Sequence, residues 1–358
     1  MKILRIVILI CCFIPFFSED SGAQGHSPNN VVVGCPVRDT SPKLDSLHNI
    51  INRNIDQSLV INGLAKEFIT QTKDSRYRIS ENDTLSKNFI VPTSENSFGK
   101  LLGTIIDSGI NELPIGERIA AIGKLLLDKP YIEKSLETTT DESATVCNLQ
   151  GFDCVTLFEN SWALATMLKN DYGHTYAGFL RELTNHRYRN GIRNGFDSRL
   201  HYTSDYFYDN ALRGNLKEMT KIIGGKDAKR EKKHINFMTM HPSSYAQLQN
   251  DPFMFVKMDS VEERINRRGG FYYIPKEDVE DIEKGIQTGD LIGITTSVPG
   301  IDCSHTGIAI KEKDGRIHFM NASSAMHKVI ISQVPLAEYL SGNSKQTGIM
   351  IYRPIEPK

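Results

Sequence analysis

Residues 303–323 read CSHTGIAIKEKDGRIHFMNAS, and this stretch decides the fold of the C-terminal part of the chain. Two runs rich in β-branched residues, 306–310 and 316–320, flank the turn sequence Lys313-Asp314-Gly315. An Asp-Gly turn between two such runs is typical of a β-hairpin. We therefore predict two antiparallel strands with residues 305 and 321 almost opposite one another. Cross-strand neighbours lie about 5 Å apart at Cβ, so an amide at 321 is expected within reach of a side chain at 305.

Further runs of the same character extend this predicted sheet. They are residues 291–296, 329–332 and 348–352. Upstream, residues 154–168 are apolar around the whole circumference of a helix, which predicts a buried helix. Helical spacing of apolar residues also predicts helices over 44–59, 98–106 and 115–126. Helices followed by a run of antiparallel strands indicate an α+β fold.

The composition is that of an ordinary globular protein. The chain has 358 residues, of which 39% are hydrophobic, and its 42 Lys and Arg residues nearly balance its 43 Asp and Glu residues, for a formal net charge of −1. Nucleic-acid binders usually carry a strong basic surface, so nucleic acid is not an expected partner. The length allows one large domain or two ordinary ones.

The first 23 residues have the three successive parts of a secretory signal peptide, which are a basic start, an apolar stretch and small residues before the cleavage site. Lys2 and Arg5 give a positive start, residues 6–17 are apolar apart from Pro15, and Ser21-Gly22-Ala23 places small residues before a cut after Ala23. That stretch is shorter than the roughly 20 residues of a membrane-spanning helix. We therefore predict that residues 1–23 are a signal peptide and that the protein is exported to the periplasm without stable membrane insertion. A polar segment before Cys35 argues against a lipid anchor there.

Cys154 is the candidate nucleophile. It follows Gly151-Phe152-Asp153 at the predicted start of the buried helix. The helix dipole and the backbone N–H groups of the first turn favour a thiolate there, and the same groups can receive the oxygen of a tetrahedral intermediate. Two alternatives remain open. Cys154 is either a small core residue or the partner of Cys147 in a disulfide of an exported protein.

His305 is the candidate general base, because histidine titrates near neutral pH and can return a proton to a leaving amine. Asn321 is placed to orient the imidazole, as asparagine does in Cys-His-Asn proteases. His318 is expected on the other sheet face. Cys303 is expected on the same strand face as His305 and is a competing nucleophile. The alternative is that His305 is a structural histidine and that Asn321 only ends a strand.

The motifs Phe152-Asp153-Cys154 and Ser304-His305-Thr306-Gly307 resemble the NlpC-type cysteine peptidases of bacterial cell walls, which have a papain-like core. Longer stretches between about 114 and 354 resemble one lineage, the N-acetylmuramoyl-L-alanine amidase-like family. These stretches are Lys129-Pro130-Tyr131, Phe152-Asp153-Cys154-Val155-Thr156, Arg187-Tyr188-Arg189-Asn190-Gly191, Ser198-Arg199-Leu200-His201-Tyr202, Ile274-Pro275-Lys276, Thr288-Gly289-Asp290 and Asn321-Ala322-Ser323-Ser324.

The resemblance implies an α+β fold with a papain-like core, in which the nucleophile helix packs on an antiparallel sheet. It implies an amidase domain over 113–358 with a long middle insertion at about 172–280, where no strong strand pattern is visible. A leader and helical region, 24–112, precedes it. The implied substrate is a peptidoglycan fragment, cut at the amide between N-acetylmuramic acid and L-Ala. No metal or organic cofactor is expected, and a monomer is expected.

The resemblance also assigns roles to single residues. Cys154 is implied to attack the carbonyl, His305 to act as general base and acid, and the residue at 321 to orient it. Tyr131 is implied to bond the substrate or the oxyanion, and Asp153 to lie near the polar end of the substrate. Position 321 is usually histidine in the family, whereas this chain has asparagine.

Arg199 and His201 are the expected substrate ligands of the middle section. Their span is rich in arginine and tyrosine, which can grip muropeptide carboxylates and face sugar rings. Solvated arginines and packing tyrosines are the alternative. The other arginines of the span are Arg187, Arg189 and Arg193.

Two other functions remain open. One is an endopeptidase that cuts between D-Glu and the diamino acid, and the other is a non-catalytic muropeptide-binding protein.

Overall fold

The computed structural model describes residues 92–137, 142, 144–170, 173–249 and 251–357. The expected signal peptide and the predicted helix over 44–59 lie outside these residues. Within them, no helix is long and apolar enough to cross a bilayer.

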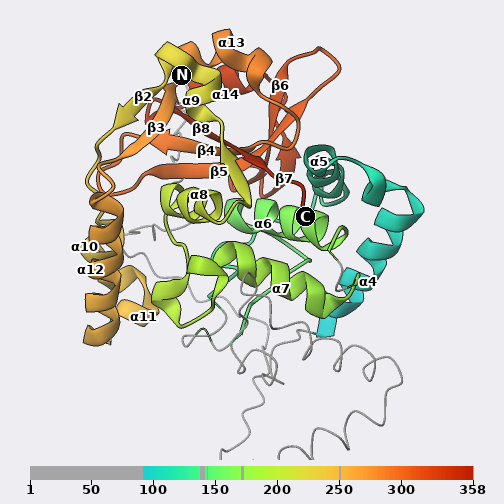
Figure 1. Cartoon of the computed structure of the whole chain (residues 1–358), viewed down its shortest axis with the longest axis horizontal. Helices are drawn as coiled ribbons and strands as arrows, with labels where there is room; N and C mark the ends of the chain where they lie inside the picture. Colours follow the sequence, from blue (N-terminus) through green and yellow to red (C-terminus); the bar gives the residue numbers. More distant parts are fainter. Residues whose placement is uncertain (1–91, 138–141, 143, 171–172, 250, 358) are drawn as a thin grey trace, which may run out of the picture. The chain divides into compact units, whose positions relative to one another are not determined.

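One antiparallel sheet forms the centre of the described part (Figure 1). Its strands are β1 (Leu216–Glu218), β2 (Lys229–Glu231), β3 (Phe271–Pro275), β4 (Leu291–Thr296), β5 (Cys303–Lys311), β6 (Ile317–Ser323), β7 (Lys328–Ile331) and β8 (Gln346–Pro354). Their spatial order is β2-β3-β8-β4-β5-β6-β7, and β1 also pairs with β8. The fold is therefore a mixture of helices and an antiparallel sheet, as the α+β prediction states.

The hairpin of β5 and β6 forms where the Asp-Gly turn predicts it. Ile308 lies opposite Met320, and Lys311 lies opposite Ile317. Side chains alternate between the two faces of a strand, so from residue 305 onward the even-numbered residues of this hairpin face one layer of helices and the odd-numbered residues face the other.

The first layer contains the predicted buried helix. Its helices are α4 (Pro92–Asp107), α5 (Ile115–Leu125), α6 (Cys154–Met167), α7 (Tyr176–Arg187) and α8 (Thr203–Leu212). Helix α6 is the centre of this layer, because it is buried on all sides except at Val155. Phe158 and Trp162 of α6 belong to the same apolar cluster as Ile308 and Met320 of the sheet. This packing holds the start of α6 against the sheet.

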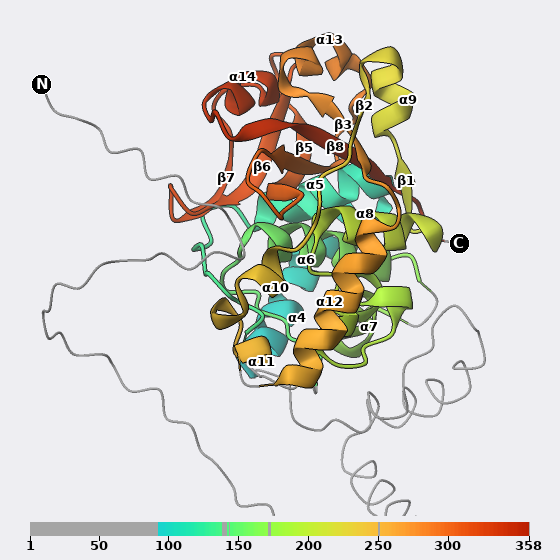
Figure 2. The same cartoon turned by 90° about the vertical axis from the view of Figure 1, so that its left-hand side faces the viewer.

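The opposite face of the sheet is covered by short helices. These are α9 (Thr220–Gly224), α13 (Val279–Ile282) and α14 (Leu336–Ser341). In Figure 2 they lie above the sheet, whereas α5 and α6 lie below it. A second apolar cluster, which includes Ile294, Phe319 and Leu340, fills this layer.

The middle section contains strands, although its sequence shows no strong strand pattern. Residues 172–280 supply three sheet strands, β1 to β3, together with α7 and α8 of the first layer. This segment is therefore built into the core, because its strands pair with β8 near the end of the chain. Another part of the segment forms a third apolar cluster. Its helices are α10 (Phe237–Met240), α11 (Ala246–Gln249) and α12 (Pro252–Asn266).

Candidate active site

Cys154 is the first residue of α6, and the start of this helix is firmly capped. Asp153 is the N-cap residue, and its Oδ1 accepts hydrogen bonds from the N–H groups of Val155 and Thr156 at 3.1 and 2.8 Å. In return, Thr156 Oγ1 accepts a hydrogen bond from the Asp153 N–H at 3.0 Å. Such a capping box fixes the first turn, and the positive end of the helix dipole favours a thiolate at Cys154.

Asp153 also lines the larger pocket described below, and it has a structural contact besides the cap. Besides the backbone N–H groups, its carboxylate accepts a 2.9 Å hydrogen bond from Ser135 Oγ, and its side chain is buried. Asp153 therefore holds the helix start and the segment that carries Ser135. The N–H groups of Val155 and Thr156 are occupied by the cap, so these two groups do not receive a substrate oxygen.

His305 lies on β5 and is bonded to Asn321 of β6. Its Nε2 is 3.0 Å from Asn321 Oδ1, while Asn321 Nδ2 donates to the Phe319 carbonyl at 3.2 Å. Because the amide oxygen faces Nε2, this nitrogen carries the proton and Nδ1 is the basic nitrogen. Both side chains are buried, and Phe319 packs edge-on against the imidazole. The structure thus holds the ring in one tautomer.

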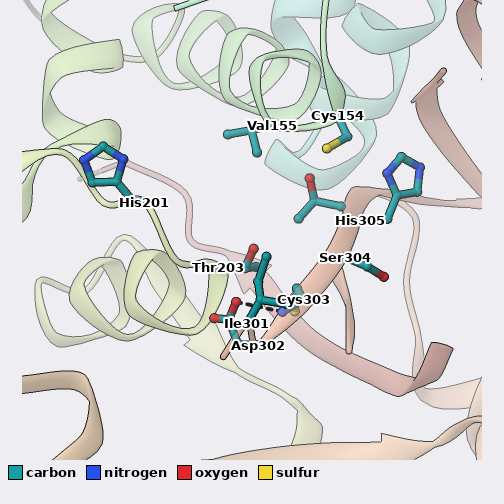
Figure 3. Close-up of a pocket in the computed structure, with 10 residues that line it drawn as sticks. Cys154, Val155, His201, Thr203, Ile301, Asp302, Cys303, Ser304 and His305 are labelled. Atoms are coloured by element: carbon teal, nitrogen blue, oxygen red, sulfur yellow. Dashed lines mark hydrogen bonds between the residues drawn. The ribbon is translucent and has the colours of Figure 1, made fainter. Parts of the chain in front are cut away.

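Cys154 and His305 line one pocket, which we call the nucleophile pocket (Figure 3). They reach it from different elements, the start of α6 and the start of β5. The cavity volume is about 20 Å³. Its lining residues are Cys154, Val155, His201, Thr203, Ile301, Asp302, Cys303, Ser304, His305 and Thr306.

A β-bulge at Ser304 corrects the expectation for Cys303. His305 lies opposite Ile294 of β4, but Cys303 lies opposite Thr295, the next residue of that strand. Neighbouring positions on β4 face opposite sides, so Cys303 and His305 also point to opposite faces. Sequence spacing alone places them on the same face. The two side chains do not share a face, because Ser304 is an extra residue in the strand.

The three cysteines of the described part, Cys147, Cys154 and Cys303, are buried and form no disulfide. The alternative of a Cys147–Cys154 disulfide is therefore not what the structure shows. Burial raises the pKa of the Cys147 thiol to about 12. Burial, together with the charge of Asp302, also raises the pKa of the Cys303 thiol well above its usual value. Both thiols are protonated at neutral pH and are poor nucleophiles.

A second pocket, which we call the adjoining pocket, shares Val155 and His201 with the nucleophile pocket. Its cavity volume is about 150 Å³. It is lined by Lys134, Leu136, Glu137, Asp153, Val155, Glu159, Arg187, Arg199, Leu200, His201, Ser244, Tyr245, Ala246 and Gln247.

Arg199 and His201, the expected ligands of the middle section, both line the adjoining pocket. Arg199 forms ion pairs with Glu142 at 2.8 Å and with Glu137 at 2.5 Å. His201 Nε2 lies 2.8 Å from the Phe196 carbonyl, to which it donates. Burial and the charge of Arg199 lower the pKa of His201 well below its usual value, so the ring is neutral. Arg199 is thus already neutralised within the protein.

Tyr131 lies beside the nucleophile but belongs to the lining of neither pocket. It forms an isolated parallel bridge with Phe152, two residues before Cys154, and its N–H donates to the His327 carbonyl. His318 bonds the Ser332 carbonyl and the Asp314 carboxylate, away from His305, as predicted. Among the described residues, no group of three or more His, Cys, Asp or Glu side chains is arranged to hold a metal ion.

Sequence reasoning missed two residues of the nucleophile pocket. Asp302 is fully buried and accepts hydrogen bonds from the N–H groups of Ser204 and Cys303, which ties the start of α8 to the start of β5. Thr306 is 2% exposed, and its hydroxyl has no hydrogen-bond partner within the described residues. An unsatisfied buried hydroxyl is costly, so Thr306 is a donor available to a substrate. The His-Thr-Gly motif contains this threonine but gives no sign of its isolation.

The chain matches a known protein family over more than half of its length. A family model described as N-acetylmuramoyl-L-alanine amidase-like matches residues 121–349, which is more than half of the chain. The chain belongs to the N-acetylmuramoyl-L-alanine amidase-like family. Cys154, His305 and Asn321 all lie within the matched residues.

The chain is also similar to solved structures of other proteins. An N-acetylmuramoyl-L-alanine amidase from Bacteroides uniformis is 34% identical, with a TM-score of 0.61, and the match covers 68% of this chain and 99% of that one. A Bacteroides fragilis protein, assigned provisionally as a xylanase, is 32% identical, with a TM-score of 0.58 and coverage of 64% and 98%. A Legionella pneumophila protein shares the fold at 24% identity and a TM-score of 0.57, with coverage of 74% and 96%. The search of the curated proteins gave no match.

Proposed function

We propose that this protein is an exported cysteine amidase that hydrolyses the amide bond between N-acetylmuramic acid and L-Ala in peptidoglycan fragments. The observation that carries the proposal is the hydrogen bond from His305 Nε2 to Asn321 Oδ1, in a pocket that His305 shares with Cys154. A basic Nδ1 on a fixed imidazole, together with a thiol at a helix start, supports acyl transfer through cysteine.

The reaction follows from these groups. His305 Nδ1 takes the thiol proton, and Cys154 Sγ attacks the carbonyl carbon of the lactyl group of N-acetylmuramic acid. The C–N bond then breaks, His305 gives its proton to the departing amine of L-Ala, and a thioester remains on Cys154. Water, deprotonated by His305, attacks the thioester and releases the muramic carboxylate and the free thiol. Asn321 holds the imidazole in the required orientation throughout.

The papain-like, NlpC-type placement belongs to the same proposal. It is supported by the nucleophile at a helix start, by a base and an orienting amide on neighbouring strands, and by the chain order Cys, His, Asn. The small-residue pattern before residue 24 supports export.

Product analysis tests the proposal. The purified protein is incubated with muropeptides, with and without a chelator, and the products are identified by mass spectrometry. Free muramic sugar and an intact stem peptide are expected, with activity lost in Cys154→Ala and retained in the control Cys303→Ala. A dipeptide left on the sugar would instead show an endopeptidase. Binding without turnover in the unaltered protein would show a non-catalytic muropeptide-binding protein.

A further inference from the structure

The arginines that line the adjoining pocket are neutralised within the protein. Arg187 Nε and Nη2 lie 2.9 Å from Glu159 Oε2, and its Nη1 donates to the Val146 carbonyl at 2.6 Å. Arg199 has two carboxylate partners, Glu137 and Glu142. A guanidinium that is buried and ion-paired has little attraction left for a substrate anion, because a second carboxylate would have to displace the first.

Two arginines beyond the pocket are also bonded within the protein. Arg189 forms a bidentate pair with Asp205, which is completely buried. Arg193 donates to the Glu142 carbonyl. The arginines of this span are therefore bonded within the protein, and of these only Arg187 and Arg199 line the adjoining pocket among the described residues. The expected contact with substrate carboxylates then falls to another residue.

Lys134 is the exception among the cations of this pocket. It is exposed, and within the described residues no carboxylate lies within ion-pair distance of its ammonium group. The other cations of the lining, Arg187 and Arg199, are buried and paired. An ammonium group at the mouth of a pocket keeps its full charge for an incoming anion.

The position of Lys134 is set by the segment that also holds the nucleophile. Its neighbour Ser135 is buried and donates to Asp153, the N-cap of α6. Upstream, the Ile132 N–H donates to the Phe152 carbonyl at 2.9 Å, so the segment is bonded to the residues just before Cys154. Lys134 itself has φ +54°, a left-handed conformation that lysine seldom adopts. Such conformations persist where the surrounding structure enforces them, and they are concentrated at functional sites.

We propose that Lys134 binds a carboxylate of the stem peptide while that peptide lies in the adjoining pocket. The inference rests on the proposed amidase function, because the stem peptide is the leaving group of that reaction. The two pockets share Val155 and His201, so a peptide leaving Cys154 enters the space whose mouth carries Lys134. Lys134 is thus a specificity residue for acidic stem peptides.

The test compares muropeptides that differ by one charge. One pair has the glutamate carboxyl as free acid or amide, and a second pair has the C-terminal carboxyl as free acid or amide. Lys134→Asn removes the ammonium group and keeps a residue that adopts positive φ readily. Lys134→Arg retains the charge. Lys100→Asn, an exposed lysine on α4 outside both pockets, is the matched control.

For the unaltered protein, one of the two amides should raise KM by about three- to fivefold with kcat little changed, as expected for one exposed ion pair. Lys134→Asn should cleave acid and amide with the same KM, whereas Lys134→Arg and Lys100→Asn should keep the preference. Turnover without any preference, or a preference that survives in Lys134→Asn, overturns the inference and leaves the amidase intact. Absence of turnover with every muropeptide overturns the amidase and this inference together.

Discussion

The imidazole of His305 is held by Asn321 through a 3.0 Å contact between Nε2 and Oδ1, across two neighbouring strands. The Asn321 amide is itself oriented by its bond to the Phe319 carbonyl. The group that orients the imidazole carries no charge, because the acceptor is the amide oxygen of Asn321. Several measurable consequences follow from it and from the surrounding contacts.

Asn321→Ala should lower kcat roughly ten- to a hundredfold, because an imidazole that is not oriented seldom presents Nδ1 to the thiol. KM should change little, since Asn321 lines neither pocket. Steady-state kinetics with a muropeptide substrate provide the measurement. Asn321→His, which retains a hydrogen-bonding ring, should keep more activity than the alanine variant. Equal activity of Asn321→Ala and the unaltered protein would remove Asn321 from the mechanism.

Alkylation at neutral pH should modify Cys154 before the other two thiols. Burial raises the pKa of Cys147 to about 12 and that of Cys303 well above its usual value, so both react slowly. Peptide mass spectrometry after brief iodoacetamide treatment measures the order. Activity should fall in step with labelling of Cys154. Faster labelling of Cys303 would restore it as the competing nucleophile.

Thr306→Val should lower kcat by about tenfold while leaving the folded state at least as stable. Valine has the shape of threonine without the hydroxyl, which has no partner in the described part of the chain. Thr306→Ser, which keeps a hydroxyl, is the matched control and should retain most of the activity. Kinetics and thermal unfolding of both variants are compared. If valine leaves kcat unaltered, the hydroxyl plays no part in the reaction.

Arg199→Gln should destabilise the protein by about 3–5 kcal/mol, because it leaves the buried Glu142 without its ion-pair partner. Urea unfolding measures the change. Arg267→Gln breaks an exposed pair with Glu263 and should cost less than about 1 kcal/mol. A higher KM for Arg199→Gln without loss of stability would instead indicate direct contact with substrate.

Glu182 should make the protein less stable as pH rises from about 4.5 to 7. Burial raises the pKa of this carboxyl to about 7, against opposing hydrogen bonds from Asn185 and Asn170. The folded protein therefore holds the proton more tightly than the unfolded chain. The resulting stability is complete below the unfolded pKa and is lost as pH rises through the folded pKa.

The variant Glu182→Gln remains neutral at every pH and should not show this loss. The stability of the unaltered protein relative to the variant should fall by ~3 kcal/mol between pH 4 and 8. Urea unfolding across that range measures the difference. His186, 3.7 Å away, has the opposite dependence, because burial lowers its pKa well below its usual value. His186 is present in both proteins, so the comparison removes its own titration and reports Glu182 together with its contact to His186. Parallel pH profiles would contradict the prediction.

Local signals account for the parts of the site that the sequence predicts. The start of α6 and the hairpin that joins His305 to Asn321 both depend on residues close together in the chain. By contrast, β1 and β2 have the sequences LKE and KRE, which show no apolar alternation. They are strands only because distant partners, β8 and β3, supply the hydrogen bonds.

The adjoining pocket was beyond sequence reasoning for the same reason. Gln247 donates to Glu137, 110 residues away, and this contact exists only in the folded chain. The arginine motif was recognised, but its carboxylate partners come from segments that no spacing rule connects with it. The arginine-rich sequence therefore predicts a role for Arg199 in substrate binding, but it does not predict the two ion pairs that neutralise Arg199 in the folded chain.

The extra residue in β5 makes the length of this strand as important as its composition. Ser304 is an extra residue between Cys303 and His305, so the alternation of side chains between the two faces changes at this point. Replacing Ser304 by another residue preserves the shift. Removing it would force one of the two neighbours to exchange faces, either taking the base away from the nucleophile or placing Cys303 outside its apolar layer. The relative orientation of Cys303 and His305 therefore depends on the number of residues here more than on their identity.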